Sequence, residues 1–375
     1  MKILIAPDSF KESVEALDVC HAIQSGFSQV FPDADYKLLP MADGGEGTSA
    51  VLSYVLGGRW KEVRVHDPLM RPINAKYLLL PDATAVIEVA QACGLHLLTV
   101  AERNPVIASS YGVGELIEDA LNEGVKRIII GLGGSATNDA GIGMLQALGF
   151  QFLDKSRKAL GQGGETMEKI AHICTQNVHE SLKNAHFIVA CDVQNPFYGP
   201  NGAAAVYARQ KGADDAMIEE LDRGMRSFAQ VILKETGRDI SNIPGSGAAG
   251  GMGGGMLAFL NAELRSGADL LLDLSQFESK IADADLIITG EGRIDRQSLM
   301  GKIPGKILEI GKRKGIPVIA IAGCVEDEGI LMSAGFKGIF VTKPDSMPLE
   351  EAMKPGIAQQ NIKSVLASAH LETFI

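Results

Sequence analysis

Short apolar runs that end in polar, glycine-rich turns recur at both ends of this chain and constrain its fold more than any other feature. Residues 2–6 (KILIA) end at Pro7-Asp8, residues 14–30 follow with helical spacing, and a second run covers residues 36–40. Later runs of the same kind cover residues 286–289, 318–322 and 339–342, with helix-like segments such as 304–314 among them. Strands joined by helices predict a doubly wound parallel sheet, built here from both chain ends.

The middle of the chain has a different pattern. Short apolar runs at residues 62–66, 75–80 and 86–90 are separated by Pro and Asp without a helix, which predicts antiparallel strands. Helix-like segments then precede runs at 127–130 and 187–191. With 375 residues, two domains are expected. We predict an α/β fold in which residues 1–70 and 282–375 form one domain and residues 71–281 an inserted α/β domain with a mixed sheet. Small ligands usually bind in the cleft between domains.

Composition and charge exclude several classes of protein. The formal net charge is −11 and no basic stripe is present, which argues against a nucleic-acid partner. The five cysteines are scattered without a CxxC pair, as in a reduced protein without a metal cluster. No apolar run approaches the ~18 residues that cross a bilayer, and the N-terminus lacks a signal-peptide pattern. We therefore expect a cytoplasmic protein without a membrane partner.

Polar side chains follow the predicted strands, where ligands of a parallel sheet usually bind. The first strand leads to Asp8, Ser9 and Lys11. The turn MADGGEGT contains the residues Asp43, Gly44, Gly45 and Glu46, and a late strand leads to Glu291, Arg293 and Asp295. Each single residue is explained as a helix cap, but capping does not need two carboxylates and three glycines in one turn. Glycines that let backbone amides approach a ligand explain that turn better.

The segment RIIIGLGGSATNDAG leaves two interpretations open. Gly131, Gly133 and Ala136 match the GxGxxA pattern of dinucleotide-binding proteins, and Asp154 ends the next strand-like run. This favours an NAD-linked oxidoreductase. However, Thr137, Asn138 and Asp139 stand where apolar packing residues are expected, and such side chains suit phosphate oxygens and Mg²⁺ better.

Two further segments are candidates for ligand contacts. Asp192 and Asn195 follow a predicted strand and suit a hydroxyl or Mg²⁺, although an Asx-turn is the simpler alternative. Lys211 is interpreted as a solvated surface lysine rather than a phosphate ligand. The glycine-rich residues 245–256 suit either a ligand loop or a hinge. P-loop, HRD and DFG motifs are absent, which excludes the common kinase folds.

The sequence resembles the type I glycerate kinases (bacterial glycerate 2-kinases). The resemblance rests on DSFKESVEA, MADGGEGT, DPLMRP, GLGGSATNDAG, residues 192–212, GAAGGMGGG and DLIITGEGRIDRQSLMGKIP, which follow one another in the family's order. Four residues depart from what the family often has: glycine is common at the positions of Glu12, Met70 and Lys306, and proline at that of Arg209.

The resemblance implies a flavodoxin-like domain formed by both chain ends, an inserted α/β domain, and an active site in the cleft between them. It also implies ATP- and Mg²⁺-dependent phosphorylation of (R)-glycerate, with 2-phosphoglycerate more expected than 3-phosphoglycerate. It leaves a homodimer open. An NAD-linked oxidoreductase and a sugar-acid binding protein remain as alternatives, which NADH absorbance and binding without turnover would reveal.

We assign roles to the candidate residues as hypotheses. Asp192 is the expected base, assisted by Lys11 and Asp43. Glycerate is expected to contact Asp8, Ser9, Gly44, Gly45, Glu46 and Arg71. Nucleotide phosphates are expected at Gly133, Gly134, Ser135, Thr137, Asn138, Gly250, Gly251 and Gly253. Mg²⁺ is expected near Asp192 or Asp295.

Overall fold

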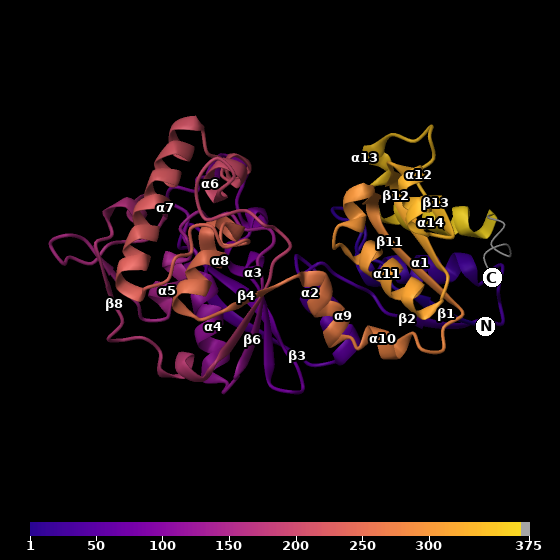
Figure 1. Ribbon diagram of the computed structural model, residues 1–375, viewed down its shortest axis with the longest axis horizontal. Helices are drawn as coiled ribbons and strands as arrows, with labels where there is room; N and C mark the ends of the chain where they lie inside the picture. The colour runs from indigo at the N-terminus through magenta and orange to yellow at the C-terminus, as the bar shows by residue number, and fades with distance from the viewer. Residues whose placement is uncertain (369–375) are drawn as a thin grey trace. The chain divides into compact units, whose positions relative to one another are not determined.

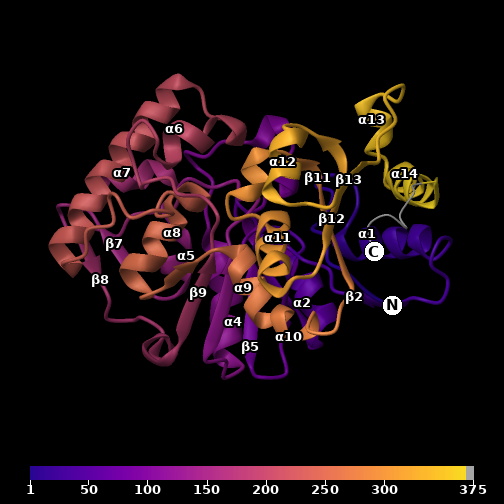
Figure 2. The same ribbon diagram turned by 45° about the vertical axis from the view of Figure 1, so that its right-hand side comes forward.

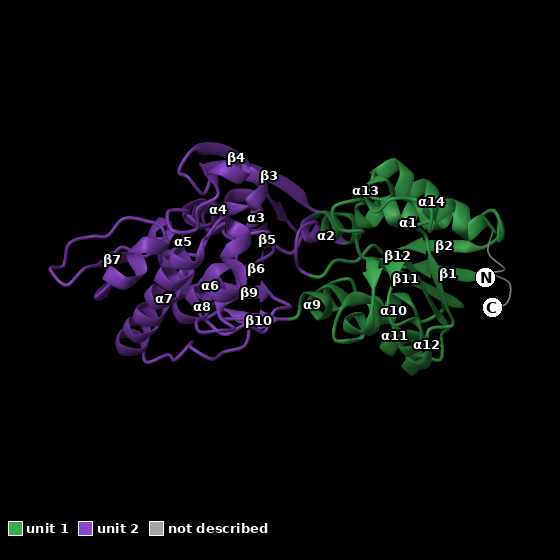
Figure 3. Ribbon diagram, turned by 90° about the horizontal axis from the view of Figure 1, so that it is seen from above, with its two compact units in different colours: residues 1–43, 50–55, 266–375 green, residues 44–49, 56–265 purple. Residues whose placement is uncertain are grey.

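The computed structural model describes residues 1–368, which divide into two compact units (Figure 3). Unit 1 comprises Met1–Asp43, Ala50–Val55 and the chain from Ser266 onwards. Unit 2 comprises Gly44–Ser49 and Leu56–Arg265. Both ends of the chain therefore belong to the same unit, as the sequence predicts.

Unit 1 contains a five-stranded parallel sheet in the order β13-β12-β11-β1-β2. Its strands are β1 (Lys2–Ile5), β2 (Asp35–Leu38), β11 (Leu286–Ile294), β12 (Val318–Val325) and β13 (Gly338–Val341). In Figure 1 the indigo N-terminal strands and the orange and yellow C-terminal strands share this sheet. This is the flavodoxin-like strand order, which confirms the predicted fold class.

Helices cover both faces of the unit 1 sheet (Figure 2). Ile3 and Ile5 of β1 pack with helices α1 and α14, whereas Leu4 and Ala6 pack with helices α9 to α12. Because neighbouring side chains of a strand point to opposite faces, burial on both faces explains the uninterrupted apolar run KILIA. The helices of this unit are α1 (Ala16–Phe27), α9 (Gly267–Leu274), α10 (Phe277–Lys280), α11 (Ile303–Lys314), α12 (Glu328–Ala334), α13 (Leu349–Ala352) and α14 (Pro355–Ser368), together with most of α2 (Thr48–Leu56).

Unit 2 contains a six-stranded mixed sheet in the order β10-β9-β6-β5-β4-β3. Its strands are β3 (Arg59–His66), β4 (Pro72–Leu79), β5 (Thr84–Glu88), β6 (Arg127–Gly131), β9 (His186–Ala190) and β10 (Glu263–Arg265). The strands β3, β4 and β5 pair antiparallel, as predicted, and the others pair parallel. A separate two-stranded sheet joins β7 (Gln151–Leu153) to β8 (His172–Cys174).

One continuous hydrophobic core joins the sheet and helices of unit 2. The helices are α3 (Ala90–Cys93), α4 (Tyr111–Asn122), α5 (Ile142–Ala147), α6 (Ala203–Tyr207), α7 (Asp215–Thr236) and α8 (Ala248–Phe259). Rings of Phe152, Phe228 and Phe259 pack together, with centroids 5.6 to 6.4 Å apart. These rings tie the small β7–β8 sheet to α7 and α8.

The boundaries of the units differ from the predicted ones after residues 70 and 281. Strand β3 pairs with β4 from Arg59↔Leu79 to His66↔Pro72, so strand pairing places this part of the chain in unit 2. Helices α9 and α10 instead pack on the unit 1 sheet through Ala268 and Phe277. Apolar patterning shows that a segment is a strand or a helix, but it does not show which sheet the segment joins.

Candidate functional site

Three carboxylates lie near the carboxyl edge of the unit 1 sheet, two of them after a strand and one within the last part of a strand. Asp8 follows β1, Asp43 follows β2, and Glu291 lies in β11. Strand β1 lies between β2 and β11, so the ends of these strands are adjacent. The gap between β1 and β11 is the switch point of this strand order, where ligands of flavodoxin-like sheets bind.

Asp8 is the most deeply buried of these carboxylates, with 5% of the residue exposed. Its Oδ1 accepts a hydrogen bond from the Ser9 backbone N–H at 2.7 Å, and its own N–H donates to Gly290 O at 2.8 Å. Burial and the negative charges of Asp43 and Glu291 raise its pKa to about 7, against the opposing effects of the Ser9 amide and Lys11. Asp8 can therefore exchange a proton near neutral pH.

Lys11 and Asp43 form an ion pair beside Asp8. Lys11 Nζ donates to Asp43 Oδ2 at 2.5 Å, and the lysine side chain is 67% exposed. Burial of its inner part lowers the Lys11 pKa, but the charges of Asp43, Asp8 and Glu291 outweigh this and raise it. The charged form of this ammonium is thus favoured by three acidic groups, and it lies in a position to contact an anionic ligand.

Glu291 and Asp295 are held by the segment that follows β11. Glu291 accepts from Ser298 Oγ and from Lys302 Nζ, the latter at 3.2 Å. Asp295 caps the 3-10 helix η6 (Arg296–Leu299) by accepting from the backbone N–H of Gln297 at 2.8 Å and of Ser298 at 3.3 Å. The cap explains why an aspartate stands at position 295 without a metal ion.

Arg71 is engaged by carboxylates of unit 2. Its Nε donates to Asp67 Oδ2 at 2.6 Å and its Nη1 to Glu102 Oε1 at 2.6 Å. Both bonds raise its pKa. A guanidinium already neutralised by two carboxylates is a poor partner for a third, so this geometry disfavours the predicted contact with glycerate.

The loop between β6 and α5 is organised by a buried lysine. Lys211 is 2% exposed, and its Nζ donates to Thr137 O at 2.6 Å and to Ser135 Oγ at 3.0 Å. Burial lowers its pKa to about 8, although Cys93 and Asp139 oppose the shift. The interpretation of Lys211 as a solvated surface residue is therefore wrong. Its burial depends on a loop more than 70 residues earlier in the chain, which local sequence does not reveal.

Several polar atoms of the same region have no hydrogen-bond partner in the described part of the chain. They are Thr137 Oγ1, Asn138 Oδ1 and Ser246 Oγ, all on residues that are 0% exposed. Asp139, in contrast, is fully satisfied by the N–H and Oγ of Ser110 and by the amides of Gly141 and Gly143. Buried polar atoms without partners are costly unless a water or a ligand meets them.

The glycines predicted to contact nucleotide are placed against protein. A Cβ at Gly250 would lie 2.1 Å from Thr137 O, and one at Gly253 would lie 2.5 Å from Gly245 O. Gly251 has the φ of 88° that favours glycine and faces Phe197 and Met225. Close packing alone explains these glycines, and their contact with nucleotide stays a prediction.

The part of the turn MADGGEGT from Gly44 onwards is also packed within unit 2. A Cβ at Gly131 would lie 2.6 Å from Gly44 O, and one at Gly133 would lie 3.0 Å from Gly45 Cα. The Glu88 carboxylate accepts from the amides of Ser49 at 2.6 Å and Gly47 at 3.3 Å. Residues 44–49 and the loop after β6 therefore form one assembly, with Glu46 exposed on it and Gly134, at φ 72°, completing its turn.

Asp192 is exposed directly after β9, whereas Asn195 is part of a local network. Asn195 Nδ2 donates to Asn201 O at 2.8 Å, and Asn195 Oδ1 accepts from Tyr207 Oη at 2.6 Å. Asn195 thus holds the segment that follows β9, and Asp192, three residues earlier, lies on the exposed surface.

The structure contradicts the dinucleotide-binding interpretation. Asp154 follows β7, which pairs with β8 in a sheet of its own rather than beside β6. The loop after Gly131 runs to Gly141 before α5 begins, instead of opening a helix directly. A strand–turn–helix unit with an acidic residue on the next strand is what that fingerprint requires.

Comparisons with known proteins decide the family. A family model described as "Glycerate kinase family" matches residues 3–370. This chain belongs to the glycerate kinase family. It is 47% identical over 356 residues to a glycerate kinase of Halalkalibacterium halodurans, covering 94% of each chain. It is 43% identical to the glycerate 2-kinase of Escherichia coli K12, covering 98% of each chain.

A solved structure supports the same placement. The crystal structure of a protein assigned as glycerate kinase 2 from Salmonella typhimurium LT2 matches this chain with a TM-score of 0.86 and 44% identity. The match covers 98% of this chain and 96% of that one. Membership of the glycerate kinase family accounts for the two α/β units and identifies the chain as a kinase rather than an oxidoreductase.

Proposed function

We propose that this protein transfers the γ-phosphoryl group of ATP to the 2-hydroxyl of (R)-glycerate and gives 2-phosphoglycerate and ADP. The match over nearly the whole chain to curated glycerate kinases, one of them a glycerate 2-kinase, carries this proposal. The described part of the chain has no helix long and apolar enough to span a bilayer. We place the reaction in the cytoplasm, and a homodimer stays a prediction for light scattering to check.

The chemistry needs a base and a charged environment. The substrate hydroxyl oxygen attacks the γ-phosphorus, the bond from that phosphorus to the β–γ bridging oxygen breaks, and the hydroxyl proton leaves to a base. We propose Asp8 as this base because it is buried, lies at the sheet's switch point and has a pKa raised to about 7. Lys11 beside it is placed to contact an anionic oxygen of the substrates, and the negative charge of Asp43 helps to raise the pKa of Asp8.

Of the two carboxylates expected near Mg²⁺, Asp192 and Asp295, only one suits the metal. Magnesium usually takes one or two protein carboxylates together with waters and substrate phosphates. Among residues 1–368, no group of three or more His, Cys, Asp or Glu side chains is arranged to hold a metal. Asp295 is used as a helix cap, so Asp192, which is exposed, is the better candidate. When bound, Mg²⁺ would supply positive charge to the phosphoryl group.

A coupled assay of ADP release tests the function. Purified protein with MgATP should release ADP when (R)-glycerate is added, and phosphorus NMR should identify the 2-phospho product. Absence of glycerate-dependent ADP release, or a shift in NADH absorbance with hydroxy acids, would overturn the assignment.

Variants separate Asp8 from Asp192, the base expected from the sequence. Asp8→Asn should lower kcat by at least ~10²-fold and remove the rise of kcat/KM through about pH 7. Asp192→Asn should also lower kcat by at least ~10²-fold, because Mg²⁺ would lose a ligand, but the rise near pH 7 should persist. If Asp8→Asn keeps the pH profile while Asp192→Asn loses it, Asp192 is the base.

A further inference from the structure

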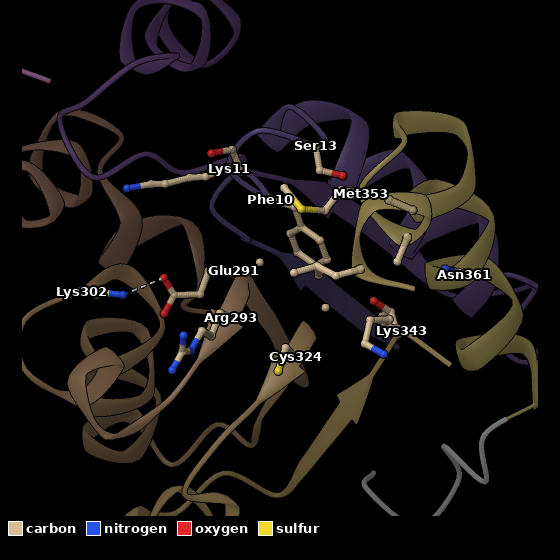
Figure 4. A pocket seen from close by; sticks show the side chains of 17 residues that line it. Phe10, Lys11, Ser13, Glu291, Arg293, Lys302, Cys324, Lys343, Met353 and Asn361 are labelled. Atoms are coloured by element: carbon tan, nitrogen blue, oxygen red, sulfur yellow. Dashed lines mark hydrogen bonds and ion pairs between the residues drawn. The ribbon is translucent and has the colours of Figure 1, made fainter. Parts of the chain in front are cut away.

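A pocket of about 450 Å³ opens at the carboxyl edge of the unit 1 sheet, next to the carboxylates of Asp8, Asp43 and Glu291 (Figure 4). Its floor consists of residues that end or follow four strands, β1, β11, β12 and β13. Its other wall is formed by helices α13 and α14, through Leu349, Ala352, Met353, Ala358 and Asn361. Every lining residue belongs to unit 1, so this unit forms the pocket by itself.

The two ends of the pocket differ in chemistry. In Figure 4, Lys11, Glu291, Lys302 and Arg293 lie at one end, while Met353 and Asn361 lie at the other, with Phe10 towards the apolar side. The charged end adjoins the carboxylates described above, since Lys11 pairs with Asp43 and Lys302 with Glu291. The pocket thus suits a ligand with an apolar body and an anionic end.

The apolar end of the pocket contains the Phe10 ring, whose backbone is held in place, and two polar side chains, Ser13 and Asn361, that can form hydrogen bonds with a ligand. Phe10 is 4% exposed and is held by reciprocal backbone bonds with Val14 at 2.8 and 2.9 Å. Ser13 Oγ is buried and has no hydrogen-bond partner among the described residues. Asn361 Nδ2 contacts the Met347 sulfur at 3.5 Å, a weak partner for an amide. A planar heteroaromatic base matches this combination of apolar surface and unfilled polar atoms.

Size separates the two substrates of the proposed reaction. Pockets of roughly 300–1,000 Å³ bury drug-sized ligands, and a three-carbon acid would leave most of this one empty. Glycerate also has no apolar part for the wall of Leu349, Met353 and Ala358. We propose that this pocket binds the adenosine part of ATP, with the base at the α13–α14 end and the phosphates directed to Lys11 and Lys302. This inference rests on the proposed kinase function.

A native thiol reports on the pocket without turnover. Cys324 of β12 lines it and is partly exposed. Cys174 of β8 in unit 2 is also partly exposed and serves as the internal control, whereas burial raises the pKa of the Cys20 and Cys93 thiols and makes both unreactive. Alkylation by iodoacetamide is followed peptide by peptide with mass spectrometry.

The expected result is selective protection. ADP at ten times its Kd should slow alkylation of Cys324 about tenfold, because only the free protein reacts. Adenosine alone should protect as well at its own saturating concentration, while glycerate or inorganic tripolyphosphate should not, and Cys174 should react at an unchanged rate. Protection of Cys324 by glycerate but not by adenosine, or no protection at saturating ADP, overturns the proposal.

A matched pair of variants on one helix gives an independent measurement. Asn361→Ala should weaken ADP binding about 3- to 10-fold, the worth of one hydrogen bond, and leave the KM for glycerate unchanged. The neighbouring Gln360→Ala, on the exposed face of α14, should leave ADP binding unchanged. Equal ADP affinity in both variants counts against the pocket. Active enzyme without Cys324 protection refutes only this site, whereas protection without glycerate-dependent turnover refutes only the proposed reaction.

Discussion

Glu12 and Met70 have left-handed backbone conformations, with φ of 61° and 62°, and both are exposed. Side chains with a Cβ pay about 1–2 kcal/mol there, whereas glycine does not. These are two of the positions at which the family often has glycine. We expect Glu12→Gly and Met70→Gly each to stabilise the protein by about 0.5–1 kcal/mol, after the greater unfolded-state entropy of glycine is subtracted. Urea denaturation would measure both.

Lys306 provides the control for these substitutions. It is a third position at which glycine is frequent, but it lies within α11, and its Nζ pairs with Asp269 Oδ1 at 2.9 Å. Lys306→Gly should therefore cost about 1 kcal/mol. If all three glycine variants shift stability in the same direction, backbone strain at residues 12 and 70 is not the cause.

The raised pKa of Asp8 makes stability depend on pH. Between its ordinary pKa of 3.8 and its folded value of about 7, the folded state holds a proton that the unfolded state has lost. Stability should then fall as pH rises through this window, by up to roughly 1.4 kcal/mol per pH unit. Asp8→Asn lacks this proton, so its advantage over wild type should grow from pH 4 to pH 7 and then level off. A constant difference across this range would contradict the pKa.

Position relative to a strand could be predicted from the sequence, but the partners of each side chain could not. Asp8, Asp43 and Glu291 were expected at strand ends because apolar runs stop just before or within their turns. The carboxylates that occupy Arg71, in contrast, come from a tight turn and from a 3-10 helix some 31 residues away. Asp295 shows the same limit, since one side chain can cap a helix or bind a metal and the sequence is identical in both cases.

At the scale of elements, the loop from Gly131 to Gly141 depends on Lys211 for its shape. Lys211→Met removes the donor from Ser135 Oγ and Thr137 O and should cost about 1–3 kcal/mol, in part offset because a buried charge is also removed. The variant should lose activity as well if this loop contacts nucleotide phosphates. Thermal unfolding and ADP release would measure both effects.

The lowered pKa of Lys211 also predicts that stability depends on pH in the alkaline range. Because its folded pKa is lowered from 10.5 to about 8, the unfolded state binds more protons between these values, and wild-type stability should rise with pH in this window relative to Lys211→Met. Lys155→Met, at an exposed lysine of the same unit, should parallel wild type. A Lys211→Met curve that also parallels wild type from pH 8 to 10 would show that the lysine is not buried in solution.

Glycine-rich segments illustrate why element-level prediction was partial. The turns at residues 43–48 and 131–136 are expected from the sequence to hold ligands, and residues 245–256 to form either a ligand loop or a hinge, since glycine lets a backbone approach another group closely. The structure confirms the close approach, but the approaching groups are largely other turns of unit 2. Composition cannot distinguish a glycine that admits a phosphate from one that admits a neighbouring backbone.

At the scale of the whole molecule, unit 1 is built from pieces far apart in the chain. Strand β1 pairs with β2 on one side and with β11 on the other, across more than 280 residues. The regular strand–helix rhythm at both chain ends made this layout predictable. The residues at which the chain passes from one unit to the other could not be predicted, because β3 and helices α9 and α10 are compatible with either unit until pairing and packing are known.

This architecture predicts how fragments behave. Residues 44–265 hold the complete core of unit 2 and should unfold cooperatively by circular dichroism. Omitting residues 44–55 should destabilise that fragment, because the buried Glu88 carboxylate loses the amides of Gly47 and Ser49. The chain from Ser266 onwards should not fold alone, since β11 lacks β1 and the apolar side chains of α14 lack α1. Adding residues 1–55 in trans should restore a cooperative transition, and a cooperative melt of the C-terminal fragment without them would refute this dependence.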